Sequence, residues 1–438
     1  MNKIRKITVG ILSGKEIEFS FSGDFLCSNG LVYNKSQKVI FKNGKIFFDN
    51  NFHENLTFLP ESDNDFFELK NVVIGKQFHW QQSENQRFCE TLTFIIENDS
   101  LTAINEIDVE SYLKSVISSE MSANASDELL KAHAVISRSW LLANLITDDE
   151  LQTAKTDTPR LSPLASRFVT WYERDAHTNF DVCADDHCQR YQGITRQTNE
   201  RVNKAVEATQ GMVLTCGGEI CDARFSKSCG GVTEIFENCW ADTHFTYLES
   251  VIDSEQPTDF SLDLTKNGDA EKFICSQPEC FCNTREPKIL SQVLNNYDQQ
   301  TTDIFRWQCE FSQKEIAEII AKKSGVDFGA IMDLVPLKRG ASGRIVELQV
   351  VGTKQVAIVG KELEIRKWLS QTHLYSSAFV VEKSDFSTDI PQRFLLRGAG
   401  WGHGVGLCQI GAAVMGEKGY NFKEILAHYY KNTEISSR

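Results

Sequence analysis

Apolar and polar residues alternate in short runs over the first hundred residues of the chain. Runs such as KITVGIL, EIEFSFSG and VIFKNGKIFF have the period of two that half-buried strands show. The Asn-Gly pair in the last run suits the type I′ turn of a β-hairpin. Residues 1–100 therefore predict a β-rich N-terminal region. The basic start lacks the long apolar stretch of a secretion signal, so we expect a strand there instead.

The apolar period changes to that of a helix from residue 107 onward. Tyr112 and Val116 recur at a spacing of four, and the same step leads to Glu120. A second helix is expected over DELLKAHAVISRSWLLANLI, with Ser126 as its N-cap. His133 lies on the apolar face of this second helix, which predicts a satisfied core or boundary histidine.

The remainder of the chain mixes strands and helices and ends in a glycine-rich stretch. Residues 205–240 return to short strands, and residues 241–390 have apolar periodicities of their own. The pattern predicts an α+β fold in which helices pack on antiparallel strands. We expect a β-rich region at 1–100, a core of 101–240 plus 391–438, and an intervening subdomain at 241–390.

Length, charge and cysteine content narrow the classes of function. The chain has 438 residues, 41% of them apolar and 24% charged, as in globular proteins of two or three domains. Its net charge of −14 argues against nucleic acid as a partner and permits a neutral substrate such as a sugar chain. No apolar run reaches the ~18 residues of a transmembrane helix. The 13 cysteines are an odd number, so we expect mostly buried free thiols, with a subset available for a metal.

Glu120 is the first candidate for chemistry, because it continues an apolar stripe. A carboxyl group near apolar surface holds its proton to higher pH, since burial disfavours the charged form. Such a group can act as a general acid near neutral pH. In the alternative, the helix ends before Glu120 and the side chain simply reaches solvent.

A second candidate is the segment HTNFDVCADDHC, which predicts a zinc site. It holds four soft ligands within twelve residues: His177, Cys183, His187 and Cys188. The last two are adjacent, so both can bind one ion only across a turn, which Asp185 and its neighbour make plausible. Four protein ligands leave no open position, so the metal would be structural. The alternative is two free thiols and two surface histidines.

The third candidate is the glycine-rich segment GAGWGHGVGLCQIGA. Its glycines allow positive φ and close backbone approach, but neither a phosphate-binding loop nor a dinucleotide fingerprint is present. Trp401 and His403 could contact a ligand by stacking and hydrogen bonding, and a buried structural crossover is the equal alternative. A cysteine nucleophile at Cys229 with His403 as base is a weaker hypothesis, because buried free cysteines are common.

Four blocks together resemble one family, the stage II sporulation protein D and LytB-type amidase-enhancer family. They are DVESYLKSVISSEMSANASDELLKAHAVISRSW, DVCADDHCQRYQGI, CDARFSKSCGGVTEIFENCW and GAGWGHGVGLCQIGA, which cover most of 107–240 and 396–415. The resemblance implies a lytic transglycosylase that cuts peptidoglycan strands already stripped of stem peptides. It assigns the catalytic glutamate to Glu120 and a structural zinc to the cysteine/histidine block. It also places Arg138, Trp401, His403 and Gln409 in the motifs expected to bind substrate.

The resemblance leaves two further functions open. The chain could be a non-catalytic glycan-binding protein that enhances an N-acetylmuramoyl-L-alanine amidase. It could also be a zinc hydrolase, if water replaced one of the four metal ligands. The family implies the cell envelope, whereas the missing signal leaves the cytoplasm open. Two residues depart from the family pattern: His133 stands where glutamine is common, and Cys408 where serine is commoner. If the enzyme reading holds, we expect Glu120 and the glycine-rich segment to face one cleft.

Overall fold

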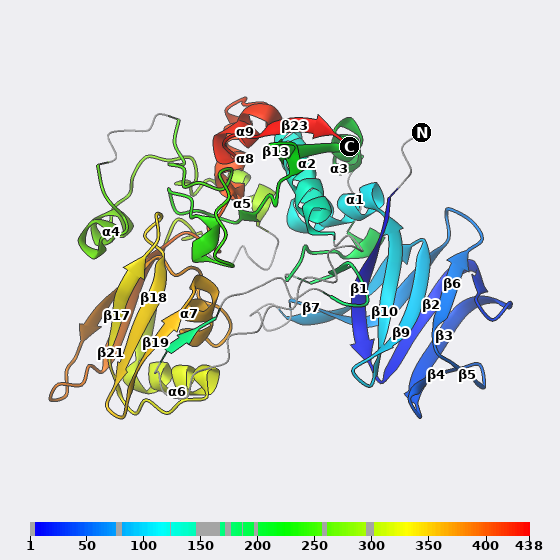
Figure 1. Cartoon of the computed structure of the whole chain (residues 1–438), viewed down its shortest axis with the longest axis horizontal. Coiled ribbons are helices and arrows are strands. Elements are labelled where there is room, and N and C mark those ends of the chain that lie inside the picture. The colour runs from blue at the N-terminus through cyan, green and yellow to red at the C-terminus, as the bar shows by residue number, and fades with distance from the viewer. Residues whose placement is uncertain are drawn as a thin grey trace. The chain divides into compact units, whose positions relative to one another are not determined.

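The computed structural model describes residues 5–75, 81–122, 124–145, 167–170, 177–185, 187–196, 200–255, 261–294 and 302–438. The α+β class predicted from the sequence is confirmed, and so is the β-rich N-terminal region (Figure 1). The chain forms two compact units. Unit 1 consists of residues 1–123 and 176–211, and unit 2 of residues 124–175 and 212–438. The division into three parts made from the sequence stays a prediction.

Unit 1 is built on one large sheet, whose strands β1 to β10 are drawn from blue to cyan in Figure 1. Its main path runs β12-β1-β10-β9-β6-β2-β3-β4-β5, and β7 joins β2 to β8. The strands are β1 (Lys6–Gly14), β2 (Glu16–Cys27), β3 (Val32–Lys42), β4 (Lys45–Phe48), β5 (Asn51–His53), β6 (Leu56–Pro60), β7 (Phe66–Ile74), β8 (Gln82–Cys89), β9 (Thr91–Glu97), β10 (Ser100–Asp108) and β12 (Val182–Cys183). Between β3 and β4, Asn43 and Gly44 have φ of 53° and 74°, as the predicted hairpin turn requires.

Helix α1 (Val109–Glu120) follows β10 directly. The carboxylate of Asp108 accepts hydrogen bonds from the backbone N–H groups of Glu110 and Ser111, and so caps its first turn. The short helix η1 (Gly193–Thr195) and helix α3 (Glu200–Ala208) pack against α1 and complete the unit. One end of α1 is therefore fixed by the sheet and its flank by the returning chain.

Helix α2 (Asp127–Asn144) begins unit 2, and its Ser126 cap is confirmed by a hydrogen bond from the N–H of Leu129. It packs on β13 (Met212–Cys216), α8 (Gln409–Glu417) and α9 (Phe422–Tyr429). Strand β13 pairs with β14 (Glu219–Ile220) in a hairpin and with β23 (Glu434–Ser437), in line with the short strands predicted over 205–240. Thus the C-terminal helices, red in Figure 1, lie beside a helix far earlier in the chain.

The rest of unit 2 consists mainly of two sheets and the helices that pack on them. One sheet orders β11 (Arg167–Val169), β19 (Val356–Gly360), β18 (Ile345–Gly352) and β17 (Ile331–Arg339), and another orders β16 (Arg306–Ser312), β21 (Arg393–Ala399) and β20 (Phe379–Ser384). Helices α6 (Gln313–Ser324) and α7 (Glu362–Trp368) cover them, around a core that includes Trp307, Leu348 and Trp368. The remaining elements are β15 (Phe225–Ser226), β22 (Leu407–Cys408), η2 (Phe236–Asn238), α4 (Asn267–Ile274) and α5 (Pro287–Val293).

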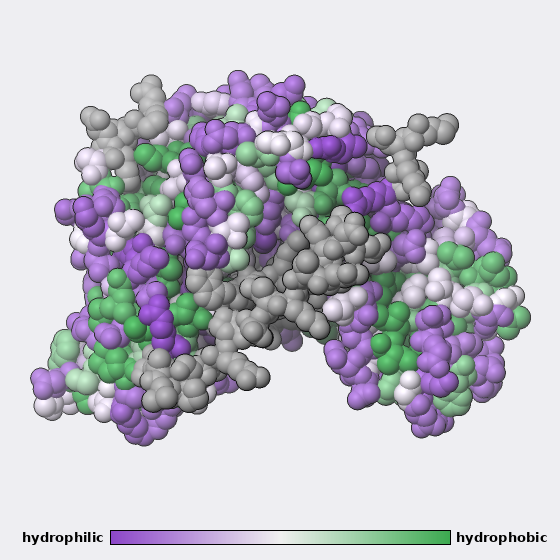
Figure 2. Space-filling view, in the orientation of Figure 1, coloured by the Kyte–Doolittle hydropathy of each residue, from purple (hydrophilic) through white to green (hydrophobic). Residues whose placement is uncertain are grey.

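The surface matches the composition. The face seen in Figure 2 is largely hydrophilic, with apolar residues in separate patches. Within the described ranges, no helix has both the length and the apolar character that crossing a bilayer requires.

Candidate functional site

Glu120 is the last residue of α1, and its side chain is buried. Val116 and Tyr112, one and two helical turns earlier, are fully buried, and Glu120 is only 7% exposed. The alternative, in which the helix ends sooner and the carboxylate reaches solvent, is therefore not observed. Burial and the negative end of a helix both disfavour the charged form of a carboxyl group. The stripe predicted from the sequence is confirmed, and the catalytic role stays a prediction.

A hydrogen-bonded segment of unit 1 holds α1 against the sheet. Tyr112 stacks on Tyr191, with ring centroids 5.1 Å apart. The Tyr191 hydroxyl donates to Oδ1 of buried Asn105 at 2.5 Å, and the N–H of Gln192 donates to the hydroxyl of Ser115 on α1 at 3.3 Å. Burial raises the pKa of both tyrosines well above the usual value, so their hydroxyls stay protonated. The segment thus fixes the helix that ends in Glu120.

The four predicted metal ligands lie directly before this segment, and their donor atoms converge. One nitrogen or sulfur from each of His177, Cys183, His187 and Cys188 lies within 4.8 Å of every other. The N–H of Cys188 donates to the carbonyl of Asp185 at 3.0 Å, which closes a turn. This turn lets the adjacent His187 and Cys188 face one point, as the sequence required. The residue after Asp185 lies outside the described residues.

The spacing of these atoms fits a tetrahedral ion. Zinc bonds of about 2.3 Å to sulfur and 2.0–2.1 Å to nitrogen place the two atoms about 3.6 Å apart. The sulfur of Cys188 lies 3.5 Å from Nε2 of His177 and 3.4 Å from Nδ1 of His187, and the sulfur of Cys183 lies 3.9 Å from the same Nδ1. The residues present therefore fit zinc in number, chemistry and distance.

The metal-ligand segment is anchored on the edge of the large sheet. Strand β12 runs parallel to β1, with Gly10 opposite Cys183. A Cβ atom at Gly10 would lie 2.6 Å from the ring of Phe180, so only glycine leaves room for this ring. Asp181 accepts hydrogen bonds from the N–H and the hydroxyl of Thr8 at 2.7 and 2.8 Å. The backbone that carries the metal ligands is thus held in place by its contacts with β1.

The glycine-rich segment of unit 2 folds as predicted, with positive φ and close backbone approach. Four of its glycines have φ between 70° and 95°: Gly400, Gly402, Gly404 and Gly406. The segment runs along the SCGGVTE motif, because Trp401 bridges Ser228, Val405 bridges Glu234, and β22 pairs with β15. Two motifs that are far apart in sequence therefore form one structural body, which we call the glycine loop (residues 398–408 with 225–234).

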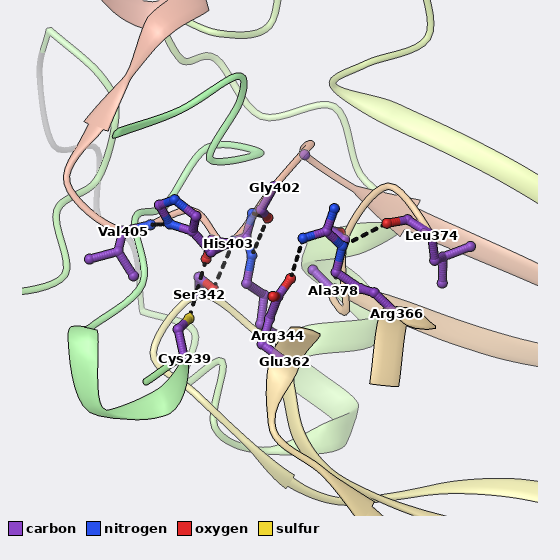
Figure 3. Close-up of polar contacts among 12 residues, drawn as sticks. Cys239, Ser342, Arg344, Glu362, Arg366, Leu374, Ala378, Gly402, His403 and Val405 are labelled. Carbon is purple, nitrogen blue, oxygen red and sulfur yellow. Dashed lines mark hydrogen bonds and ion pairs between the residues drawn. The ribbon is translucent and has the colours of Figure 1, made fainter. Parts of the chain in front are cut away.

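Arg344 holds the glycine loop from below (Figure 3). Its guanidinium is 1% exposed and donates to the carbonyls of Gly402 at 3.1 Å and Cys229 at 3.1 Å, and to the hydroxyl of Ser342 at 3.0 Å. The same hydroxyl donates to the carboxylate of Glu234, which is fully buried and also accepts from the N–H of Ser342. These contacts satisfy the buried polar groups that an irregular loop exposes.

A family model described as stage II sporulation protein matches residues 97–216, and one for a domain of unknown function, DUF8618, matches residues 234–406. The first match contains Glu120 and the zinc-type segment. The resemblance to the stage II sporulation protein D and amidase-enhancer family is thereby confirmed, with the family model covering residues 97–216.

The chain is similar to three curated relatives. It is 23% identical to an uncharacterised protein of Brachyspira hyodysenteriae, over 79% of this chain and 71% of that one. It is 25% identical to the amidase enhancer of Bacillus subtilis, over 74% of this chain but only 40% of that protein. It is 23% identical to stage II sporulation protein D of Bacillus subtilis, over 76% of each chain.

The residues that the family resemblance implies for substrate binding differ in exposure. Trp401 and His403 are partly exposed, and their rings contact Tyr375 and Trp240. Desolvation lowers the pKa of His403 well below its usual value, and the nearby arginines act in the same direction, so the ring stays neutral. They belong to unit 2 and Glu120 to unit 1, so the expectation of one shared cleft stays a prediction.

Arg138 and Gln409 are each 1% exposed, and both contact other groups of the protein. Arg138 donates to the carbonyl of Met212 at 3.0 Å. The amide nitrogen of Gln409 lies 3.0 Å from Nε2 of His133, which is confirmed as a satisfied core histidine. Contacts from these two residues to a substrate stay a prediction.

The cysteine-nucleophile hypothesis finds no support in the contacts of Cys229. Its sulfur lies with Asp253 and Cys282, whereas Nδ1 of His403 accepts a hydrogen bond from Val405. Neither Arg344 nor Glu234 was predicted from the sequence, because Arg344 stands in no motif and Glu234 only closes the SCGGVTE motif. A carboxylate at the end of SCGGVTE was the one available signal.

Proposed function

We propose that this protein is a peptidoglycan lytic transglycosylase with Glu120 as its acid and base. The observation that carries the proposal is the placement of one carboxyl group at the buried end of α1, inside the region that matches the stage II sporulation protein family. The resemblance to the family points to cell-wall glycan, and a buried carboxyl group is the kind of residue that serves as a general acid.

The chemistry needs a single carboxyl group. Glu120 would protonate the glycosidic oxygen between N-acetylmuramic acid and N-acetylglucosamine. The resulting carboxylate would then accept the proton of the muramic C6 hydroxyl as that oxygen bonds to C1. The product carries a 1,6-anhydro end, so the substrate supplies its own nucleophile. Ordinary glycosidases need a second carboxyl group for that step, and a hydroxyl held near C1 replaces it by proximity.

A structural zinc ion would support this helix. The converging sulfur and nitrogen atoms of the metal-ligand segment favour zinc, and four protein ligands leave no position for water. Tyr191 and Gln192 follow the metal ligands and bond to Asn105 and to Ser115 of α1, so an ion that fixes this segment would also fix α1. We therefore assign the ion a role in positioning and not in the reaction, which sets aside the zinc-hydrolase alternative.

We further propose that Trp401 and His403 contact the glycan. A partly exposed indole offers an apolar face to a sugar ring, and a neutral imidazole can donate or accept a hydrogen bond. Buried Arg138 and Gln409 would act as positioning residues that hold the neighbouring parts of the protein in place. The substrate lies outside the cytoplasm, so the cell envelope is the proposed site of action.

The second candidate function is a non-catalytic enhancer of an N-acetylmuramoyl-L-alanine amidase. Its support is the similarity to a protein named amidase enhancer. In this case the chain would bind glycan and present it to the amidase, and the carboxyl group of Glu120 would be dispensable.

A digest of peptide-free glycan strands, analysed by mass spectrometry, separates the two functions. Wild type is expected to yield 1,6-anhydro ends, and Glu120→Gln is expected to yield none while still pelleting with the glycan. Glu110→Gln is the matched control, since it removes a carboxylate from the first turn of the same helix and should cut normally. Reducing ends would mean that water attacks and would overturn the transglycosylase. Binding without cleavage by wild type would favour the enhancer.

A further inference from the structure

Three thiols and one carboxyl group meet in the interior of unit 2, and none of them belongs to the metal-ligand segment. They are Cys229, Asp253, Cys282 and Cys408, and all are at most 2% exposed. One sulfur or oxygen of each lies within 4.8 Å of every other. All four come from different segments of the chain, so their convergence is a property of the fold and not of a local motif.

We propose that these four residues form a second zinc site, with three thiolates and one carboxylate as ligands. Thiolate-rich tetrahedral sites select zinc, and carboxylate oxygen is an accepted fourth ligand. A site closed by four protein ligands is structural. This inference does not depend on the proposed glycan chemistry.

The distances fit a single tetrahedral ion. With zinc bonds of about 2.3 Å to sulfur and about 2.0 Å to oxygen, two sulfurs lie about 3.8 Å apart and a sulfur and an oxygen about 3.5 Å apart. The sulfurs of Cys229 and Cys282 are 3.6 Å apart, and the Cys229 sulfur is 3.5 Å from Oδ2 of Asp253. A disulfide would need about 2.05 Å between sulfurs. An iron–sulfur cluster would need space for its own atoms between the ligands.

Backbone N–H groups point at the ligand atoms, as they do around bound thiolates. The N–H groups of Cys229 and Gly411 lie 3.3 and 3.4 Å from the sulfur of Cys408, and the N–H of Gly231 lies 3.4 Å from the sulfur of Cys229. Cys408 caps α8, so the positive end of that helix also faces the site. These donors favour negatively charged sulfur.

The carboxylate is held in place by partners of its own. Tyr429 donates its hydroxyl to Oδ1 of Asp253 at 2.7 Å, while the N–H of Cys282 donates to Oδ2 at 3.1 Å. Such outer contacts orient a ligating carboxylate. Arg344 and Arg306 add positive charge nearby, through bonds to the carbonyls of Cys229 and Gly230.

The burial of four acids also calls for a compensating charge. Water is excluded from all four side chains, so the group must either keep its protons or share a cation. One divalent ion would replace protons on three thiols and one carboxyl group. It would also tie the glycine loop, through Cys229 and Cys408, to the segments that carry Asp253 and Cys282.

The test is zinc content per chain, measured by mass spectrometry of the full-length protein after dialysis. Wild type is expected to hold two zinc ions. The double variant Cys183→Ser/Cys188→Ser removes the first site and is expected to retain one ion. Adding Cys282→Ser or Asp253→Asn to this background should reduce the content to near zero. Cys221→Ser is the matched control, because it removes a buried thiol of the same unit that lies outside the site.

The double variant alone decides the case if the triple variants fail to fold. With circular dichroism like that of wild type, it should also bind Co²⁺ with the strong thiolate-to-metal absorption of a tetrahedral site. X-ray absorption should report three sulfur neighbours and one oxygen. A folded double variant that binds neither ion would overturn the proposal. So would a disulfide between Cys229 and Cys282 in protein purified without oxidant. The thiol of Cys280 contacts that of Cys282, so zinc loss from Cys280→Ser but not from Asp253→Asn would also overturn the assigned ligand set.

Discussion

Replacing Gly406 by alanine tests the close approach on which the glycine loop depends. Gly406 has φ of 70°, and an added Cβ would collide with the carbonyl oxygen of Arg224. This oxygen cannot move freely, because it accepts hydrogen bonds from the N–H of Leu407 at 3.1 Å and the hydroxyl of Tyr430 at 2.6 Å. The change therefore forces either the backbone or both hydrogen bonds to yield.

The expected loss in the free energy of unfolding has two parts. A non-glycine residue with left-handed backbone costs about 1–2 kcal/mol. Each buried hydrogen bond that is broken and leaves a group unpaired adds about 1–3 kcal/mol. With both hydrogen bonds lost, Gly406→Ala should therefore lower the free energy of unfolding by about 3–8 kcal/mol. Gly419→Ala isolates the first part, since Gly419 has φ of 91° and a Cβ there would meet no atom within 4 Å.

Urea denaturation followed by tryptophan fluorescence and circular dichroism measures both variants. The comparison uses transitions whose slope matches that of wild type. We expect Gly406→Ala to lose at least about 2 kcal/mol more than Gly419→Ala, which is the minimum for two damaged hydrogen bonds. Equal losses in the two variants would refute the reasoning, because the steric contact with Arg224 would then contribute nothing.

Two further predictions concern single side chains. Tyr191→Phe removes the hydroxyl that donates to buried Asn105, so it should lower the free energy of unfolding in urea by about 1–3 kcal/mol. Tyr33→Phe removes an exposed hydrogen bond and should lower it by less than about 0.5 kcal/mol. Similar losses in the two variants would argue against the buried contact. Burial, aided by the charges of Arg366 and Lys367, lowers the pKa of His373 from 6.5 to about 4. Wild type should therefore lose stability as the pH falls from 6.5 towards 4, because only the unfolded chain binds this proton there. His373→Gln should lose less over this window, and an unchanged pH profile would contradict the shift.

Local patterns in the sequence predicted the parts of the fold that depend on neighbours along the chain. The turn at Asn43-Gly44, the N-cap at Ser126 and the helical stripe ending at Glu120 are all present. The convergence of four metal-type ligands within twelve residues was predictable for the same reason. In each case the residues that form the feature are close neighbours in the sequence, so a local pattern is enough to predict it.

Contacts between distant segments could not be predicted in this way. Arg344 reaches Cys229, 115 positions away, and Glu234 reaches Ser342, 108 positions away. Arginine and glutamate in an ordinary strand or loop predict exposed charge, and only the assembled fold shows that they are buried partners. The site around Asp253 escaped for the same reason, since its ligands are single residues on four segments.

These long-range contacts imply that the glycine loop and the block at 241–390 fold together. An irregular loop of this kind exposes carbonyl groups that no ladder satisfies. Arg344, from within that block, satisfies those of Gly402 and Cys229, and Arg306 satisfies that of Gly230. Without these guanidinium groups, each buried carbonyl would cost about 1–3 kcal/mol. The family motif at 398–408 thus has its conformation set by residues that carry no recognisable motif themselves, and the second family match, at 234–406, spans this combination.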